Sequence, residues 1–297
     1  MMDFPVSGVE TYWWLPILVS FGISFFSSVG GVSGAFLLLP FQISVLGFTG
    51  PAVSPTNLVF CIVAIPSGVY RYWRERRMVW PLTWMTIIGT LPGVFIGAVI
   101  RVRYLPDPVS FKPFAAIVLL CIGCHLAFDF LSGSRAAVPV KPGAFSVQPR
   151  LFNLKRIEYE FEGSLYSASS GGILALGFVV GIVGGTYGIG GGAIIAPFFV
   201  SVFGLPVYTV AGATLLGTFV TSIAGVGFYA FLDTFYAQAG PAVMPDWLLG
   251  GMFGIGGAFG MYAGARLQRF VPARVIKATL ATLLLFVAVR YLVPLFN

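Results

Sequence analysis

The sequence predicts an all-α integral membrane protein made of two inverted repeats, each a glycine-broken re-entrant hairpin followed by three transmembrane helices. Composition gives the membrane class. Hydrophobic residues make up 58% of the 297 positions and charged residues only 9%, with a mean hydropathy of +0.93, which is far from the composition of a soluble domain. A glycine pattern shared by the two halves predicts the repeat, and the uneven distribution of basic residues predicts its inversion.

Long uncharged tracts define the membrane segments. They cover residues 11–70, 78–100 and 163–232, and the first and third can each hold more than one span, since a crossing takes roughly 20 residues. The spans are expected to be helical, because a β-barrel would show alternating segments of about ten residues. We expect glycine-interrupted segments at 13–47 and 171–203, and ordinary spans at 54–72, 81–100, 111–131, 207–232, 246–265 and 273–295.

A repeat relates the two halves of the chain. Shifting the sequence by 157 positions superimposes eight identical pairs without a gap: Gly31 and Gly188, Gly34 and Gly191, Pro40 and Pro197, Gly47 and Gly204, Val53 and Val210, Leu58 and Leu215, Gly68 and Gly225, and Tyr72 and Tyr229. The match predicts two related membrane domains, 1–131 and 166–297. A polar linker, 132–165, separates them. Its alternating stretch RIEYEFEG at 156–163 predicts a short strand within a strand pair.

The basic residues indicate how the two halves lie in the membrane. If each interrupted segment folds back as a hairpin, each half has an odd number of segments, and the second half enters the membrane upside down. All but four of the 17 basic residues then lie on one face, the exceptions being Arg101, Arg103, Lys112 and Arg290. A single crossing would divide them almost evenly. The positive-inside rule therefore favours the hairpins, with both termini outside and the linker in the cytoplasm, and inverted repeats are typical of secondary transporters.

The glycine clusters mark the tips of the two hairpins. They read GGVSG at 30–34 and GGTYGIGGG at 184–192. A sharp turn inside the membrane needs residues that adopt positive φ at little cost. Irregular backbone at that depth must be buried in protein or face a cavity, and the N–H groups that start the returning helix form a ready anion site. Since the uncharged tracts hold no acidic residue, an anion is the expected substrate.

These segments resemble the sulfite exporter TauE/SafE family of anion transporters. The resemblance covers nearly the whole chain and rests on GGVSGAFLLLP at 30–40, GGTYGIGGGAIIAP at 184–197, the helix starts SPTNL at 54–58 and AGATLLGT at 211–218, and the linker RIEYEFEG. It implies export of sulfite, or of an organosulfonate such as sulfoacetate, across the bacterial inner membrane from a cavity between the halves. The first half carries Asn57 where the second carries Thr214, so the resemblance implies an asymmetric site.

The candidate substrate site combines the hairpin tips with nearby hydroxyl and amide groups. Its residues are Gly31, Ser33, Gly34, Thr56, Asn57, Tyr187, Gly190, Gly191, Gly192 and Thr214. For each hydroxyl, a hydrogen bond to its own helix backbone is the competing interpretation. We expect no catalytic residue, metal or cofactor. The expected partners are a small anion and the lipid bilayer, with a homodimer as an open alternative. Nucleic acid is not expected despite the net charge of +7, because the basic residues cluster at the ends of apolar segments.

Two other functions use the same residues. Residues 31–34 spell GVSG, the G-x-S-G pattern of an intramembrane serine protease, with His125 as its base. The repeat partner of Ser33 is Gly190, which favours a structural need for a small residue at a hairpin tip. A passive anion channel is the second alternative, since it differs from a carrier only in lacking alternating access.

Three further patterns have simpler interpretations. Cys121, Cys124 and His125 spell the C-x-x-C-H of covalent haem attachment, but they lie in an apolar helix without a free loop. His125 and Asp129, four residues apart, suggest either a charge pair near the interface or a proton relay. Glycines also recur at four-residue spacing, at 89, 93 and 97 and again at 256, 260 and 264. This spacing predicts close helix packing.

Overall fold

A computed structural model gives the structure of the chain and describes residues 1–30, 33–74, 78–131, 147–153, 155–161, 163–236, 242–267 and 273–293. The first half contains β1 (Met2–Phe4), β2 (Val9–Thr11), α1 (Trp14–Gly30), α2 (Ala35–Ser44), α3 (Val53–Ala64), α4 (Pro66–Arg74), α5 (Trp80–Arg103) and α6 (Pro108–Leu131). The linker contains β3 (Val147–Phe152), β4 (Arg156–Phe161) and β5 (Ser164–Ser169). The second half contains α7 (Ser170–Tyr187), α8 (Gly192–Ser201), α9 (Val207–Tyr236), α10 (Trp247–Leu267) and α11 (Ala273–Leu292).

Five helical stretches of the described residues are long and apolar enough to cross a membrane: Val53–Arg74, Trp80–Arg103, Pro108–His125, Ser170–Tyr187 and Thr209–Tyr236. The first of these joins α3 and α4. Ile65 lies between them, directly before Pro66, whose nitrogen has no hydrogen to donate to the preceding turn. The predominantly helical membrane class is therefore confirmed.

Both glycine-interrupted segments consist of a long helix and a short one. Helix α1 has 17 residues and α2 has 10, which correspond to about 26 Å and about 15 Å. Helices α7 and α8 repeat this arrangement with 18 and 10 residues. The short helices reach only about half of a hydrocarbon core of roughly 30 Å. Between α7 and α8 the chain turns at Gly188 and Gly190, whose φ angles are 86° and 71°. The predicted use of positive φ is thus confirmed at the second tip.

The first helix of each half packs against a helix of the other half. Helix α1 lies against α10, and α7 lies against α5. The regularly spaced glycines make these contacts: a Cβ atom on Gly256, Gly260 or Gly264 would meet the backbone oxygen of Ile17, Phe21 or Phe25, respectively, and one on Gly93 or Gly97 would meet that of Phe178 or Ile182. The predicted close packing is confirmed. The contacted positions 21 and 25 correspond to 178 and 182 under the 157-residue shift, so the same contact occurs twice.

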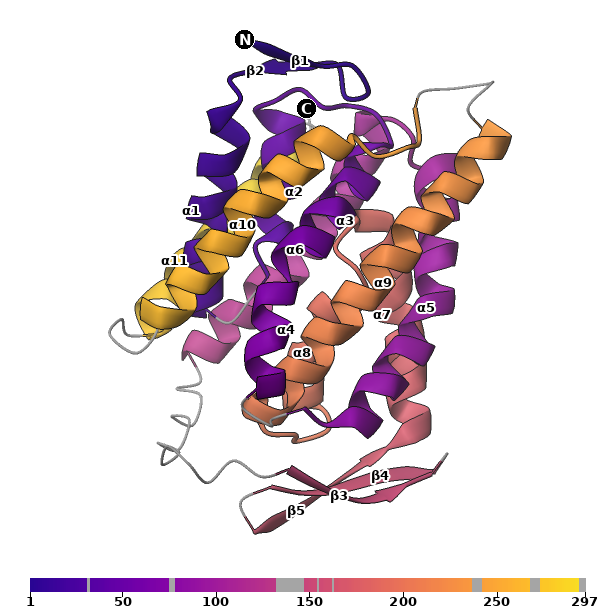
Figure 1. The fold of residues 1–297 in the computed structure, drawn as a ribbon, viewed down its shortest axis with the longest axis vertical. Coiled ribbons are helices and arrows are strands. Elements are labelled where there is room, and N and C mark those ends of the chain that lie inside the picture. The colour runs from indigo at the N-terminus through magenta and orange to yellow at the C-terminus, as the bar shows by residue number, and fades with distance from the viewer. Residues whose placement is uncertain are drawn as a thin grey trace.

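The strands lie at opposite ends of the helix bundle (Figure 1). The hairpin β1–β2 precedes α1 at one end. The antiparallel sheet β3–β4–β5 lies at the other end, where β5 leads directly into α7. Helices α1 and α7 therefore begin at opposite ends of the bundle.

The linker sheet has three strands where the sequence predicts a pair, and β5 continues to Ser169, past the expected boundary at residue 165. In β4 the apolar residues Ile157, Tyr159 and Phe161 are buried, as their alternation predicts. The hydroxyl of Tyr159 lies 2.8 Å from that of Thr209 in α9. The sheet is therefore attached to the helix bundle by both packing and a hydrogen bond.

Candidate functional site

Asn57, near the start of α3, connects the two hairpins. Its side-chain amide donates to the backbone oxygens of Ala35 in α2, at 3.2 Å, and of Gly188 at the second tip, at 2.9 Å. Its side-chain oxygen accepts from the amide of Gln42, at 3.3 Å. Both Asn57 and Gln42 are fully buried. Because an amide can donate and accept at once, this one side chain holds parts of both halves together.

Tyr187 supplies a second connection between the hairpins. Its hydroxyl donates to the backbone oxygen of Phe36, at 2.9 Å, and its ring packs against Phe111. At the first hairpin, the Ser33 hydroxyl accepts from the N–H of Ala35, at 3.3 Å. Gly34 packs closely against Ser24 of α1. Gly31 lies outside the described residues.

The second tip is enclosed by hydroxyl-bearing residues. The N–H of Gly191 donates to the Thr221 hydroxyl of α9, at 3.2 Å. A Cβ atom on Gly191 would meet the side chain of Thr90, and one on Gly192 would meet the backbone oxygen of Thr214. Gly190 lies against Thr218 and Ser222. Glycine is required at positions 191 and 192 because a side chain at either would collide with α5 or α9.

The hydroxyls of Thr56 and Thr214 bond to their own helices. Thr56 donates to the backbone oxygen of Ala52, at 2.7 Å, and also accepts from the N–H of Asp246, at 2.9 Å. Thr214 donates to the backbone oxygen of Val210, at 3.1 Å. Both hydroxyl protons therefore already take part in hydrogen bonds within their own helices. This agrees with the alternative interpretation, in which these hydroxyls bond to their own helix backbone and not to the substrate.

Among the described residues, three buried polar atoms have no oxygen or nitrogen partner within hydrogen-bond distance. They are Ser24 Oγ, Gln42 Oε1 and Ser222 Oγ. Ser24 lies against Gly34, Gln42 bonds to Asn57, and Ser222 lies against Gly190. All three therefore surround the hairpin tips, where a ligand or a rearrangement could satisfy them. The candidate list lacks these residues, although polar side chains inside uncharged tracts are a usable signal.

Arg101, in the last turn of α5, is the largest difference from the sequence-based interpretation. Counting basic residues by face assigns it to the membrane surface, but it is only 1% exposed. Its Nε donates to the Ser54 hydroxyl, at 3.1 Å. Ser54 in turn donates to the backbone oxygen of Thr186, at 3.1 Å, just before the second tip. A buried positive charge thus lies one side chain away from the hairpin.

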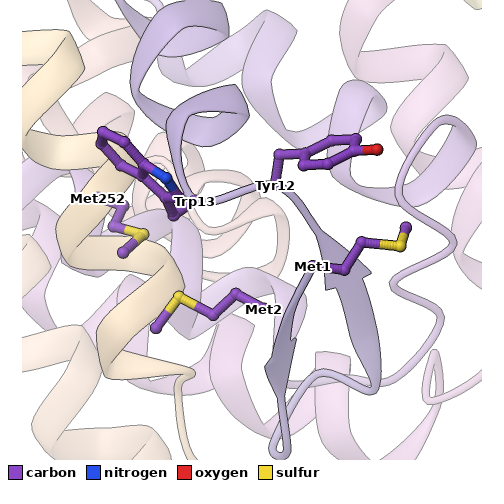
Figure 2. Close-up of a pocket in the computed structure, with 5 residues that line it drawn as sticks. All are labelled: Met1, Met2, Tyr12, Trp13 and Met252. Atoms are coloured by element: carbon purple, nitrogen blue, oxygen red, sulfur yellow. The ribbon is translucent and has the colours of Figure 1, made fainter.

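A cavity of about 420 Å³ lies away from the hairpin tips, next to the β1–β2 hairpin (Figure 2). Its lining consists of Met1, Met2, Tyr12, Trp13 and Met252. None of these side chains is charged, and none belongs to the candidate site. The tip residues 184–192 are buried, so an anion could reach them only after a rearrangement.

A family model described as Sulfite exporter TauE/SafE matches residues 16–291. The chain belongs to this family. Together with the apolar helices, membership makes it a multi-pass membrane transporter rather than an enzyme. Neither the curated proteins nor the solved structures gave a match. The match includes the tips of both hairpins of this TauE/SafE protein, as well as Asn57 and Arg101.

Proposed function

We propose that this TauE/SafE protein is a secondary transporter that exports sulfite, or an organosulfonate such as sulfoacetate, across the bacterial inner membrane. The contact of the two hairpins at Asn57 carries the proposal. It brings backbone from both halves to one buried place, beside polar atoms that have no oxygen or nitrogen partner among the described residues. A small oxyanion suits such a place because it accepts several hydrogen bonds at once.

The proposed substrate site comprises the tip glycines and the polar groups beside them. Its residues are Gly31, Ser33, Gly34, Thr56, Asn57, Tyr187, Gly190, Gly191, Gly192 and Thr214. Backbone N–H groups at the starts of α2 and α8 would provide attraction, each helix end contributing about 0.3–2 kcal/mol. Attraction of this size gives weak binding, which suits a protein that must release its substrate.

Transport requires movement, because the site is buried. The glycine contacts of α1 with α10 and of α5 with α7 leave no room for a side chain, so we propose that each pair moves as one body. In this proposal the two halves are inverted repeats that alternately open the site to either face. The end bearing β1–β2 is outside and the β3–β4–β5 sheet is cytoplasmic, in accordance with the positive-inside rule.

Uptake into liposomes tests the proposal. Purified protein is reconstituted, and entry of ³⁵S-labelled sulfite is compared with entry into protein-free liposomes. We expect uptake that saturates with concentration and that unlabelled sulfoacetate or sulfite reduces. Uptake equal to that of protein-free liposomes for both anions would reject this function.

The protease alternative lacks support in the geometry. The Ser33 hydroxyl bonds to a backbone N–H, and the His125 ring stacks against Phe198. Within the described residues no hydrogen bond joins Ser33 to His125, as nucleophilic activation would require. We therefore expect no labelling of Ser33 by a serine-reactive fluorophosphonate, and labelling that Ser33→Ala removes would reopen the alternative.

A further inference from the structure

The guanidinium of Arg101 is buried among neutral groups. Nε donates to the Ser54 hydroxyl, Nη2 donates to the backbone oxygen of Gly50 at 3.1 Å, and Nη1 donates to the backbone oxygen of Leu105. The guanidinium carbon lies 4.0 Å from the centre of the Phe111 ring. These contacts orient the cation without neutralising its charge.

The charge of Arg101 has no anionic partner in direct contact. Within the described residues no carboxylate lies within ion-pair distance of it, and the carboxylate whose field acts on it belongs to Asp107, an exposed residue. Arginine carries five N–H donors, so the three bonds above leave two for another acceptor. A buried charge without a counter-charge is costly. Retaining one inside a membrane transporter indicates a functional role.

Arg101 is also connected to the second hairpin tip. The Ser54 hydroxyl accepts a hydrogen bond from Nε–H of Arg101 and donates one to the backbone oxygen of Thr186. A Cβ atom on Gly188 would meet the Ser54 backbone. Tyr229 of α9 donates from its hydroxyl to the backbone oxygen of Gly185, next to Thr186, at 2.9 Å. Movement of the tip would therefore change the partners of the guanidinium.

We propose that Arg101 binds the transported anion directly, through the two N–H groups that its bonds to Ser54, Gly50 and Leu105 leave over. The planar fork of arginine matches two oxygens of a sulfite or sulfonate group. The identity of the anion in this inference rests on the proposed function. Its negative charge rests only on the geometry around Arg101. Arg101 adds a buried cation beside the tip to the helix dipoles and polar side chains of the proposed site.

Anion binding by purified variants in detergent tests the inference. Sulfite, sulfoacetate, phosphate and chloride are each titrated by calorimetry against wild type, Arg101→Gln, Arg101→Lys, Asp107→Asn and Arg103→Gln. Arg103 is the matched control because it lies in the same helical turn but is exposed. Asp107→Asn removes the nearby negative charge at an exposed position, where asparagine starts a helix as well as aspartate does.

We expect Arg101→Gln to weaken binding about 10- to 100-fold, Arg101→Lys to weaken it less, and Arg103→Gln to leave it unchanged. Asp107→Asn should tighten binding about two- to fivefold. Wild-type affinity in Arg101→Gln would overturn the inference while leaving the proposed function intact. If Arg101→Gln does not fold, unchanged affinity in both Arg101→Lys and Asp107→Asn has the same consequence.

The anion panel separates this inference from the proposed function. If phosphate or chloride binds in an Arg101-dependent manner and neither sulfur anion binds, the inference stands and the proposed substrate is wrong. If none of the four anions binds to wild type, both the inference and the proposed function are rejected.

Discussion

At the scale of single residues, the side chain of Asn57 joins the two hairpins through the backbone oxygens of Ala35 and Gly188. A lone asparagine in an uncharged tract, where the other half has Thr214, indicates a polar site. Its partners were not predictable, because Ala35 and Gly188 lie 22 and 131 positions away. Arg101 could not be predicted as buried either. The residues that cover it, Gly50 and Leu105, belong to loops whose path does not follow from hydropathy.

Asn57→Ala should destabilise the protein. It removes the side-chain hydrogen bonds to the oxygens of Ala35 and Gly188 and the bond from the amide of Gln42, which costs about 2–4 kcal/mol in total. The melting temperature in detergent measures the loss. Thr282→Ala, on an exposed position of α11, serves as the control and should change stability by less than about 0.5 kcal/mol. Equal melting of the two variants would show that Asn57 does not join the hairpins.

At the scale of helices and strands, the glycine clusters and the alternating linker stretch predicted more than the individual side chains did. Glycine spacing correctly predicted both interrupted helices and the close contacts, since these features depend on backbone shape alone. The third strand of the linker sheet was missed. Its sequence, SLYSAS, shows no alternation of apolar and charged residues, so pairing with β4 decides its structure.

Gly260→Ala should lower the melting temperature, whereas Gly251→Ala in the same helix should not. A methyl group at position 260 meets the Phe21 oxygen of α1, but one at 251 has nothing within 4 Å. In open space alanine favours a helix by about 0.5–1 kcal/mol over glycine. The two melting temperatures should therefore move in opposite directions. A Gly260→Ala variant as stable as Gly251→Ala would contradict the close contact of α1 and α10.

Tyr159→Phe should weaken the attachment of the linker sheet by about 1 kcal/mol, because the hydrogen bond to Thr209 is lost. Burial raises the pKa of Tyr159 to about 12. Since this pKa exceeds the ordinary value of 10.0, the neutral hydroxyl stabilises the fold below pH 10 and this contribution is lost as the pH rises towards 12. The difference in melting temperature between wild type and Tyr159→Phe should therefore decrease as the pH rises from 10 to about 12. Tyr166→Phe serves as the control. A difference between wild type and Tyr159→Phe that does not change with pH would contradict the burial of the Tyr159 hydroxyl.

At the scale of the whole molecule, hydropathy and the repeat predicted a helical membrane protein, and the family match establishes it as a TauE/SafE transporter. The repeat did not predict the exchange of partners, in which the first helix of each half packs on the other half. Contacts between distant segments of this kind are determined by packing of the complete chain. Inversion of the halves and the division at residues 131 and 166 stay predictions.

Cysteine labelling in intact cells tests the orientation. In a background where Cys121 and Cys124 are replaced by serine, a cysteine at Glu10 of β2 should react with an impermeant maleimide, and one at Lys155 should not. Both positions are exposed, at opposite ends of the bundle. Lys155→Cys should react only after the cells are permeabilised. Reaction at Lys155 but not at Glu10 in intact cells would reverse the proposed orientation.

Counterflow in liposomes tests the central claim, that this protein is a carrier of sulfur oxyanions, most directly. Liposomes containing the protein are loaded with unlabelled sulfite and diluted into a trace of ³⁵S-labelled sulfite. A carrier with alternating access exchanges the two, so labelled sulfite should rise transiently inside above its equilibrium level. A channel gives no such exchange-driven overshoot. Labelled sulfite that only reaches its equilibrium level, or that enters no faster than in protein-free liposomes, would contradict the claim.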